Sequence, residues 1–164
     1  MSETQASVCE WAEATFGPVS SNARVCARAN EEMAELLRAL TSDNLAKVPE
    51  EAADVVIVLY RLGQRLGVEI VIEPVEIQRN WDTLYIALIA NDHMAFLLRC
   101  LAINDNNQQA KFPLYHLVKC PATLVQHLGS DLQTEIDRKM QTNRSRTWLP
   151  DKTGHGYHVR PKPV

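Results

Sequence analysis

The sequence predicts an all-α protein, a helical bundle with an internally duplicated helical hairpin. Two observations support this fold class. Apolar residues recur at helical spacing along nearly all of the 164 residues. In addition, residues 29–40 align without a gap to residues 90–101, and eight of the twelve positions are identical. Two amphipathic helices can resemble each other by chance, and duplication of a hairpin is the alternative that we prefer.

The first part of the chain predicts three helices, at residues 2–16, 22–40 and 49–66. Gly17 and Pro18 are suited to end the first helix, and Ser20 or Ser21 to cap the second. Pro49 favours the first turn of the third helix, which Gly67 would end.

Residues 55–60 are dominated by β-branched side chains and are also compatible with a buried strand. The helix is favoured because the apolar pattern continues to Leu66. Residues 68–77 are expected to be extended. Three more helices are predicted at residues 83–104, 114–128 and 130–146. One all-α domain would thus span residues 1–148, followed by an irregular tail at residues 149–164.

Composition and charge exclude several classes of function. Lys and Arg number 17 against 20 Asp and Glu, a net charge of −3, whereas proteins that bind nucleic acid are usually basic. No uncharged stretch is long enough to cross a membrane. The four cysteines are widely spaced, which predicts reduced thiols in a cytoplasmic protein.

Two pairs of acidic residues stand at helical spacing. Glu32 and Glu35 lie three positions apart on the second predicted helix, and Glu51 and Asp54 lie three apart on the third. Fifteen residues separate the pairs, enough to finish one helix, turn and begin an antiparallel neighbour. Face-to-face packing of the two helices would bring four carboxylates together.

Converging carboxylates repel one another, and a divalent cation relieves that repulsion. Oxygen ligands without histidine favour Mg²⁺ or Mn²⁺ over zinc. A single Glu-x-x-Glu is usually a solvated helix face or a salt-bridge partner. Two such pairs at the spacing of a hairpin predict a metal site instead.

The second copy of the hairpin lacks these acids. Glu31, Glu32 and Glu35 align with Asp92, His93 and Phe96 in the sequence comparison. The hairpin at about residues 22–67 would therefore carry the chemistry, and the degenerate hairpin at about 84–129 would be metal-free. The apolar surplus of the degenerate hairpin predicts burial against the first hairpin or another subunit, so we expect a homo-oligomer.

Basic and aromatic residues are candidates for the remaining contacts. Lys139, Asn143 and Arg146 recur on one helix face and are suited to bind phosphate, although a basic helix end is often merely solvated. Arg144 points elsewhere, toward a possible acidic partner. Trp11 and Trp148 are candidates for stacking on a base, with core or interface packing as the alternative.

Three further residues have open roles. Arg28 lies one turn before Glu32 and would neutralise the acids or contact a phosphate. His155 and His158, in the Gly-rich tail, would cap a pocket or belong to a mobile surface tail, and the mobile tail is the preferred interpretation. His93, His116 and His127 are interpreted as ordinary core or surface histidines.

The acidic pattern resembles a known family. It resembles the signature of the MazG-like all-α nucleoside triphosphate pyrophosphohydrolases. The matching residues are Glu31-Glu-Met-Ala-Glu35, followed after fifteen residues by Glu51-Ala-Ala-Asp54. The block from Lys139 to Trp148 and the sequence Gly154-His-Gly-Tyr-His158 are similar to the ends of phage MazG-like proteins. Those of the MazZ type, which act on purine deoxynucleotides, are the most similar.

The resemblance implies a MazG-like helical bundle and hydrolysis between the α- and β-phosphates, which releases a nucleoside monophosphate and pyrophosphate. The substrate would be a (deoxy)nucleoside triphosphate, a purine such as dGTP or GTP. The metal ligands would be Glu32, Glu35, Glu51 and Asp54, and Glu31 would orient the attacking water or a ligand.

Charge balance independently calls for two or three Mg²⁺ or Mn²⁺ ions, since a triphosphate adds about four negative charges to the acidic site. A dimer or tetramer in the cytoplasm is expected (host cytoplasm if the chain is phage-encoded). The rival hypothesis is a non-enzymatic helical oligomerisation module.

Overall fold

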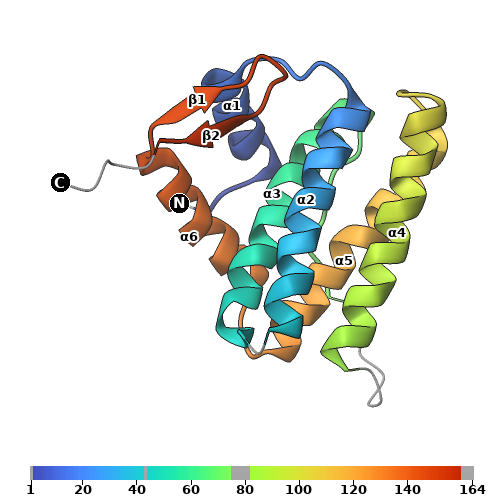
Figure 1. The fold of residues 1–164 in the computed structure, drawn as a ribbon, viewed down its shortest axis with the longest axis vertical. Helices are drawn as coiled ribbons and strands as arrows, with labels where there is room; N and C mark the ends of the chain where they lie inside the picture. Colours follow the sequence, from blue (N-terminus) through green and yellow to red (C-terminus); the bar gives the residue numbers. More distant parts are fainter. Residues whose placement is uncertain (1, 43, 75–81, 160–164) are drawn as a thin grey trace.

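The computed structural model describes residues 2–42, 44–74 and 82–159 (Figure 1). Over these residues the chain is an all-α bundle with one small two-stranded sheet, which confirms the predicted fold class. The helices are α1 (Gln5–Phe16), α2 (Asn22–Thr41), α3 (Val48–Leu66), α4 (Thr83–Ile103), α5 (Lys111–His127) and α6 (Leu132–Ser145). Two 3₁₀ turns, η1 (Leu45–Lys47) and η2 (Gln108–Ala110), precede α3 and α5.

Two helical hairpins lie side by side, the first in the middle of the bundle and the second at one edge (Figure 1). Helix α2 packs along α3, and α4 packs along α5. Across the hairpins, α2 contacts α4 and α3 contacts α5. The second hairpin therefore packs beside the first, and a pseudo-symmetric relation between them stays a prediction.

The repeat extends to the ends of the helices. Ser21 caps α2 and Asp82 caps α4, each accepting a hydrogen bond from the backbone N–H three residues on. Gly67 and Gly129 follow α3 and α5 with φ angles of 63° and 78°, a region that favours glycine. Each hairpin also has a 3₁₀ turn before its second helix.

The core includes apolar residues that the two copies share. Met33 and Met94 are completely buried, and Leu36 and Leu97 are at most 1% exposed. Both pairs occupy aligned positions, so the two copies keep the same residues at these packing positions. Helix α3 lies at the centre, in contact with α1, α2, α5 and α6, and is buried over most of its circumference.

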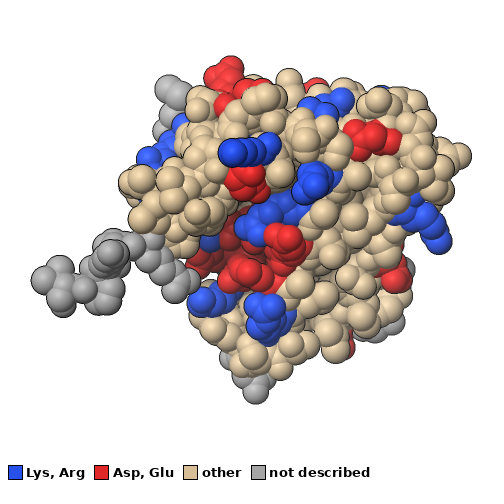
Figure 2. Space-filling model, turned by 45° about the horizontal axis from the view of Figure 1, so that its top comes forward, with Lys and Arg blue, Asp and Glu red and all other residues tan. Residues whose placement is uncertain are grey.

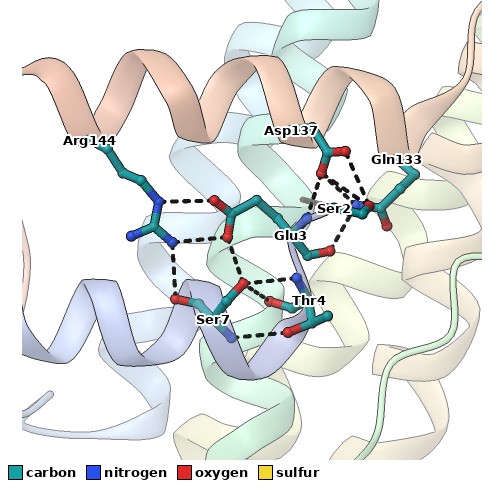
Figure 3. A network of polar contacts seen from close by, with 7 residues as sticks. All are labelled: Ser2, Glu3, Thr4, Ser7, Gln133, Asp137 and Arg144. Carbon is teal, nitrogen blue, oxygen red and sulfur yellow. Dashed lines mark hydrogen bonds and ion pairs between the residues drawn. The ribbon is translucent and has the colours of Figure 1, made fainter.

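The N-terminal segment is fastened to α6 by polar contacts (Figure 3). The Arg144 guanidinium donates two hydrogen bonds of 2.9 Å to the Glu3 carboxylate. The Asp137 carboxylate accepts from the Glu3 backbone N–H at 2.7 Å and from the Ser2 hydroxyl at 3.1 Å. The structure thus confirms that Arg144 pairs with an acid.

Helix boundaries differ from the predictions where caps decide them. Helix α1 begins at Gln5 and not at residue 2, because Thr4 and Ser7 form a reciprocal capping box. Helix α5 begins three residues earlier than expected, directly after η2. Residues 68–74 are neither helix nor strand, and the rest of the segment expected to be extended, 75–77, lies outside the described residues.

Residues 149–159 of the predicted irregular tail contain regular structure, and residues 160–164 lie outside the described residues. Strands β1 (Trp148–Pro150) and β2 (Gly156–His158) pair antiparallel, and the hairpin lies against α1 (Figure 1). Arg61 of α3 donates a 2.6 Å hydrogen bond to the Gly154 carbonyl. A Cβ atom at Gly154 would lie 2.5 Å from the Val19 Cα atom, so this close approach requires glycine.

The outer face of the second hairpin is apolar. Helix α4 exposes Leu84, Tyr85, Leu88 and Ile103, and α5 exposes Phe112 and Tyr115. By length and composition alone, α4 is the one helix of the described ranges that could cross a membrane, although a core helix of a bundle passes the same test.

Candidate active site

A cavity of about 660 Å³ opens between α1, α2, α3, α6 and the tail hairpin. Figure 2 shows acidic side chains gathered in a hollow of the surface, with basic side chains beside them. The acidic residues that line the cavity are Glu31, Glu32, Glu35, Glu51, Asp54 and Asp151. The first five are the acids that the sequence singled out.

Three of these carboxylates converge. Glu32 and Glu35 project from successive turns of α2, and Glu51 projects from the first turn of α3. Each offers an oxygen atom, and these atoms lie within 4.8 Å of one another. Carboxylate oxygens at such separations suit a hard divalent cation. The role of these residues as metal ligands stays a prediction.

Asp54 lies in the same cavity but has its own counterion. The Lys139 ammonium, which projects from α6, lies 2.5 Å from Asp54 Oδ2 and 2.7 Å from Glu50 Oε1. Lys139 thus joins α6 to α3 across the cavity. Sequence reasoning assigned this lysine to phosphate, whereas here it neutralises a predicted metal ligand.

Arg28 neutralises the acids on its own helix. One guanidinium nitrogen, Nη1, lies 2.6 Å from Glu31 Oε2, and Nη2 pairs with Glu32 Oε1. Of the two roles that the sequence left open, charge neutralisation is the one that this structure contains. The cluster of acids is therefore held between two cations, Arg28 and Lys139.

Burial makes these carboxyl groups hard to ionise. Desolvation, and then the charge of Asp54, raises the pKa of Glu32 to about 7, against the opposing effect of Arg28. Desolvation raises the pKa of Asp54 to about 6, against the opposing effect of Lys139. Burial also raises the pKa of Glu51. An additional positive charge beside these carboxyl groups would favour the ionised form of each.

Helix α6 lines the opposite wall with Lys139, Asn143 and Arg146. Asn143 is buried, and its side-chain oxygen accepts a 3.5 Å hydrogen bond from Arg146 Nη1. The three residues predicted to bind phosphate therefore face the cavity that holds the acids, and their function as phosphate ligands stays a prediction.

Aromatic residues form another part of the wall. Trp11 and Phe16 of α1 and Trp148 of β1 pack edge to face, with ring centroids 5.2 to 6.0 Å apart. The Trp148 indole N–H donates to the Asn143 carbonyl at 2.8 Å. The two tryptophans predicted to contact a base thus lie at the cavity, in contact with each other.

Sequence reasoning missed Phe16 and Arg61, which also line the cavity. Arg61 is 7% exposed and lies with its guanidinium carbon 5.9 Å from the Phe16 ring centroid. An arginine in the middle of the apolar third helix was the available signal, because a buried charge needs a compensating environment.

The second hairpin has a different set of side chains at the corresponding place. The His93 and His116 rings stack with centroids 5.3 Å apart and an interplanar angle of 16°. Phe96 is half-buried against the core, and the Arg99 guanidinium lies 5.3 Å from its ring centroid. The structure therefore places no acidic cluster like that of α2 and α3 among the described residues of α4 and α5.

Part of the chain matches a known protein family. Residues 6–80 match the family model of phosphoribosyl-ATP pyrophosphohydrolase, just under half of the chain. That family belongs to the MazG-like all-α nucleoside triphosphate pyrophosphohydrolase superfamily. The match supports a pyrophosphohydrolase that acts on a nucleotide phosphoanhydride bond. Neither curated proteins nor solved structures gave a significant match.

Proposed function

We propose that the chain is a Mg²⁺- or Mn²⁺-dependent nucleoside triphosphate pyrophosphohydrolase. It would convert a (deoxy)nucleoside triphosphate, a purine such as dGTP or GTP, to the monophosphate and pyrophosphate. The observation that carries the proposal is the convergence of Glu32, Glu35 and Glu51 in a cavity whose other walls are basic and aromatic. The family match over residues 6–80, which includes all three acids, supports the same reaction class.

The acids would hold two or three ions. Glu32, Glu35, Glu51 and Asp54 are the proposed ligands, and Glu31 would orient the attacking water. Bound divalent ions supply charge neutralisation and an acidified water molecule, which is the chemistry that attack on a phosphoanhydride requires.

The cations that now pair with acids would serve the substrate. Arg28 and Lys139 compensate Glu31, Glu32, Glu50 and Asp54 in this structure. With divalent ions at the acids, those two side chains would be released toward the phosphates. Lys139 would then act with Asn143 and Arg146 on α6, and with the aromatic wall of Trp11 and Trp148 beside the base.

The substrate of the matched family is a second candidate. The family is named for phosphoribosyl-ATP, which also contains a purine and a triphosphate. Both candidates present the same phosphoanhydride to the acids, but phosphoribosyl-ATP contains adenine in place of guanine and carries an additional phosphoribosyl group. The assay must therefore include phosphoribosyl-ATP beside the eight common nucleoside and deoxynucleoside triphosphates.

The exposed apolar face of α4 and α5 would be covered by another copy of the chain. Leu84, Leu88 and Phe112 are each about half exposed or more, which favours a homo-oligomer, a dimer or a tetramer. An enzyme of the nucleotide pool would act in the cytoplasm, where its four free thiols stay reduced. Sedimentation equilibrium of the wild-type chain and of Leu88→Glu tests the interface.

The reaction is tested by product analysis. Each triphosphate is incubated with the protein and Mg²⁺, Mn²⁺ or EDTA, and the products are resolved by ³¹P NMR. We expect monophosphate and pyrophosphate in equal amounts, with metal only. Orthophosphate as the first product would contradict cleavage between the α- and β-phosphates. No hydrolysis of any substrate, together with no effect of Mg²⁺ or Mn²⁺ on the melting temperature, would favour the non-enzymatic oligomerisation module.

A further inference from the structure

The side chain of His155 has a buried nitrogen atom that makes no hydrogen bond. Within residues 2–42, 44–74 and 82–159, its Nε2 is the one buried side-chain nitrogen or oxygen without a hydrogen-bond partner. His155 lines the cavity that holds the acids. A buried polar atom without a partner costs free energy, and a ligand that supplies the partner recovers that cost.

The turn that carries His155 is fixed by its own hydrogen bonds. Asp151 Oδ1 accepts from the backbone N–H groups of Thr153 at 2.8 Å and His155 at 3.1 Å. The Asp151 backbone N–H donates to the His155 carbonyl at 2.8 Å. Ser20 N–H donates to the Thr153 carbonyl at 3.2 Å, which ties the turn to the segment before α2. The backbone that carries the imidazole is therefore held in place at the edge of the cavity.

Arg61 provides unused donors to the same cavity. Its Nη1 donates to the Gly154 carbonyl at 2.6 Å and its Nη2 to the Gly17 carbonyl at 3.4 Å. A guanidinium has five N–H donors, so three are not used by these two bonds. In the part of the chain that the structure describes, no carboxylate lies within ion-pair distance of Arg61.

The surroundings of this pair of side chains favour a flat ligand. Phe16, Trp148 and His158 belong to the aromatic wall of the cavity, and Arg61 itself lies near the Phe16 ring. Burial, and then the charge of Arg61, lowers the pKa of His155, so its imidazole is neutral at pH 7. A neutral imidazole beside aromatic rings suits a base better than a phosphate group.

We propose that His155 and Arg61 bind the hydrogen-bonding edge of the substrate's base and select guanine or hypoxanthine over adenine. The inference rests on the proposed function. Arg61 can only donate, so the ligand edge beside it must accept. Guanine presents two adjacent acceptors, N7 and O6, whereas adenine places an amino donor beside N7. The tail hairpin would thus be the part of the enzyme that reads the base.

Two variants of His155 test the proposal. His155→Phe keeps an aromatic ring without a polar atom, and His155→Gln places an amide near the position of Nε2. The substrates are dGTP, dATP and inorganic tripolyphosphate, which has no base. For His155→Phe we expect kcat/KM for dGTP to fall at least about tenfold, with changes of less than about threefold for dATP and tripolyphosphate. His155→Gln should recover part of the loss.

The control is His127→Gln, at an exposed histidine near the end of α5. It should leave the ratio of dGTP to dATP turnover unchanged. Circular dichroism and melting temperatures of all three variants establish that they are folded.

A binding measurement separates this inference from the proposed function. Calorimetry in EDTA measures the affinity of wild-type protein and His155→Phe for guanosine and adenosine, which have no phosphate. The inference is supported if His155→Phe binds guanosine more weakly than the wild-type protein does while adenosine binding is unchanged. This holds even if no triphosphate is hydrolysed. Equal losses for dGTP and tripolyphosphate would mean that His155 contacts phosphate, and would overturn it. An unchanged guanosine preference in His155→Phe would overturn it as well.

Discussion

The two hairpins of this chain share a framework and differ in the side chains that face the groove between their helices. In the first hairpin, Glu32 and Asp54 line the same cavity, and the charge of Asp54 raises the pKa of Glu32. In the second hairpin, His93 aligns with Glu32. His116 precedes Gly129 by the same number of positions by which Asp54 precedes Gly67, and the two histidine rings stack. The aligned core residues Met33 and Met94 are identical, as are Leu36 and Leu97, whereas Glu32 and Glu35 are replaced by His93 and Phe96. Packing and chemistry are therefore carried by different positions of the same helices.

The difference is also one of charge. The first hairpin places carboxylates in a cavity and compensates them with Arg28 and Lys139, one of which comes from α6. The second hairpin replaces the acids with rings and leaves an apolar outer face. Among the residues that the structure describes, carboxylate oxygens of the kind that a hard cation prefers converge in the first hairpin and not in the second. Four experiments test this contrast.

The largest effect is expected from Glu35→Gln. The loss of one proposed metal ligand should lower turnover by roughly a hundredfold or more, because such a ligand supplies several kcal/mol in the transition state. The metal-free variant should be as stable as wild type or more so, since one charge leaves a repelling cluster. The matched control is Asp92→Asn, the position of the second hairpin that aligns with Glu31. A Glu35→Gln enzyme with more than about a tenth of wild-type turnover would exclude Glu35 as a ligand.

The next effect concerns the stability of the metal-free protein as a function of pH. The pKa of Glu32 is about 7 in the folded state and 4.5 in a free side chain. The folded state therefore binds more protons between pH 4.5 and 7, and the free energy of unfolding falls as pH rises through that window. The contribution is at most about 3 kcal/mol.

Urea denaturation in EDTA at pH 5 and pH 7.5 measures this dependence. Glu32→Gln is neutral at both values, so the difference between them should shrink. A smaller slope should remain because the pKa of Asp54 is also raised, to about 6. An identical slope in wild type and variant would show that Glu32 ionises normally.

Phe96→Glu attempts to restore an acid in the second hairpin. Phe96 is only half-buried and Arg99 lies beside it, so we expect a loss of about 1–2 kcal/mol, less than for a fully buried site. The number of Mn²⁺ ions bound per chain, counted by electron paramagnetic resonance, should stay at the wild-type value. Phe96→Leu is the control for lost packing. Additional Mn²⁺ bound by Phe96→Glu would mean that the second hairpin still has the geometry of a metal site.

The smallest effect has the opposite sign. Burial, and then the charge of His116, lowers the pKa of His93. The folded state thus resists protonation, and stability is lost as pH falls below the ordinary histidine pKa of about 6.5. Between pH 7 and pH 5.5, the His93→Gln variant should lose slightly less free energy of unfolding than the wild-type protein does. Glu32→Gln has the opposite effect, because it removes a loss of stability that occurs as pH rises. A His93→Gln chain that loses stability on acidification as wild type does would contradict the effect.

The sequence allowed the two hairpins and the acidic cluster to be predicted because both depend on local periodicity. Glu32 and Glu35 share a helix face whatever surrounds them, and the spacing to Glu51 fixes the antiparallel partner. The structure brings the oxygens of these three within 4.8 Å of one another. The duplication was visible for the same reason, since Met33 and Met94 belong to aligned segments.

The tail and the ion pairs could not be predicted because they depend on residues far apart in the sequence. Strands of three residues have no readable period, and Arg61, which holds the turn at Gly154, lies 93 positions away. Lys139 was assigned to phosphate because its helix was considered alone. Its contact with Asp54 exists only when α6 packs on α3.

The polar contacts between the N-terminal segment and α6 have a consequence for biosynthesis. Ser2 and Glu3 bond to Asp137 and Arg144, which follow them by 134 to 141 positions. At translation rates of about 5–20 residues per second, those partners emerge on the order of ten seconds after the first residues. The α2–α3 hairpin is complete well before that time. The wall that carries Lys139, Asn143 and Arg146 therefore emerges after the acidic face, and the tail hairpin that completes the cavity emerges after both.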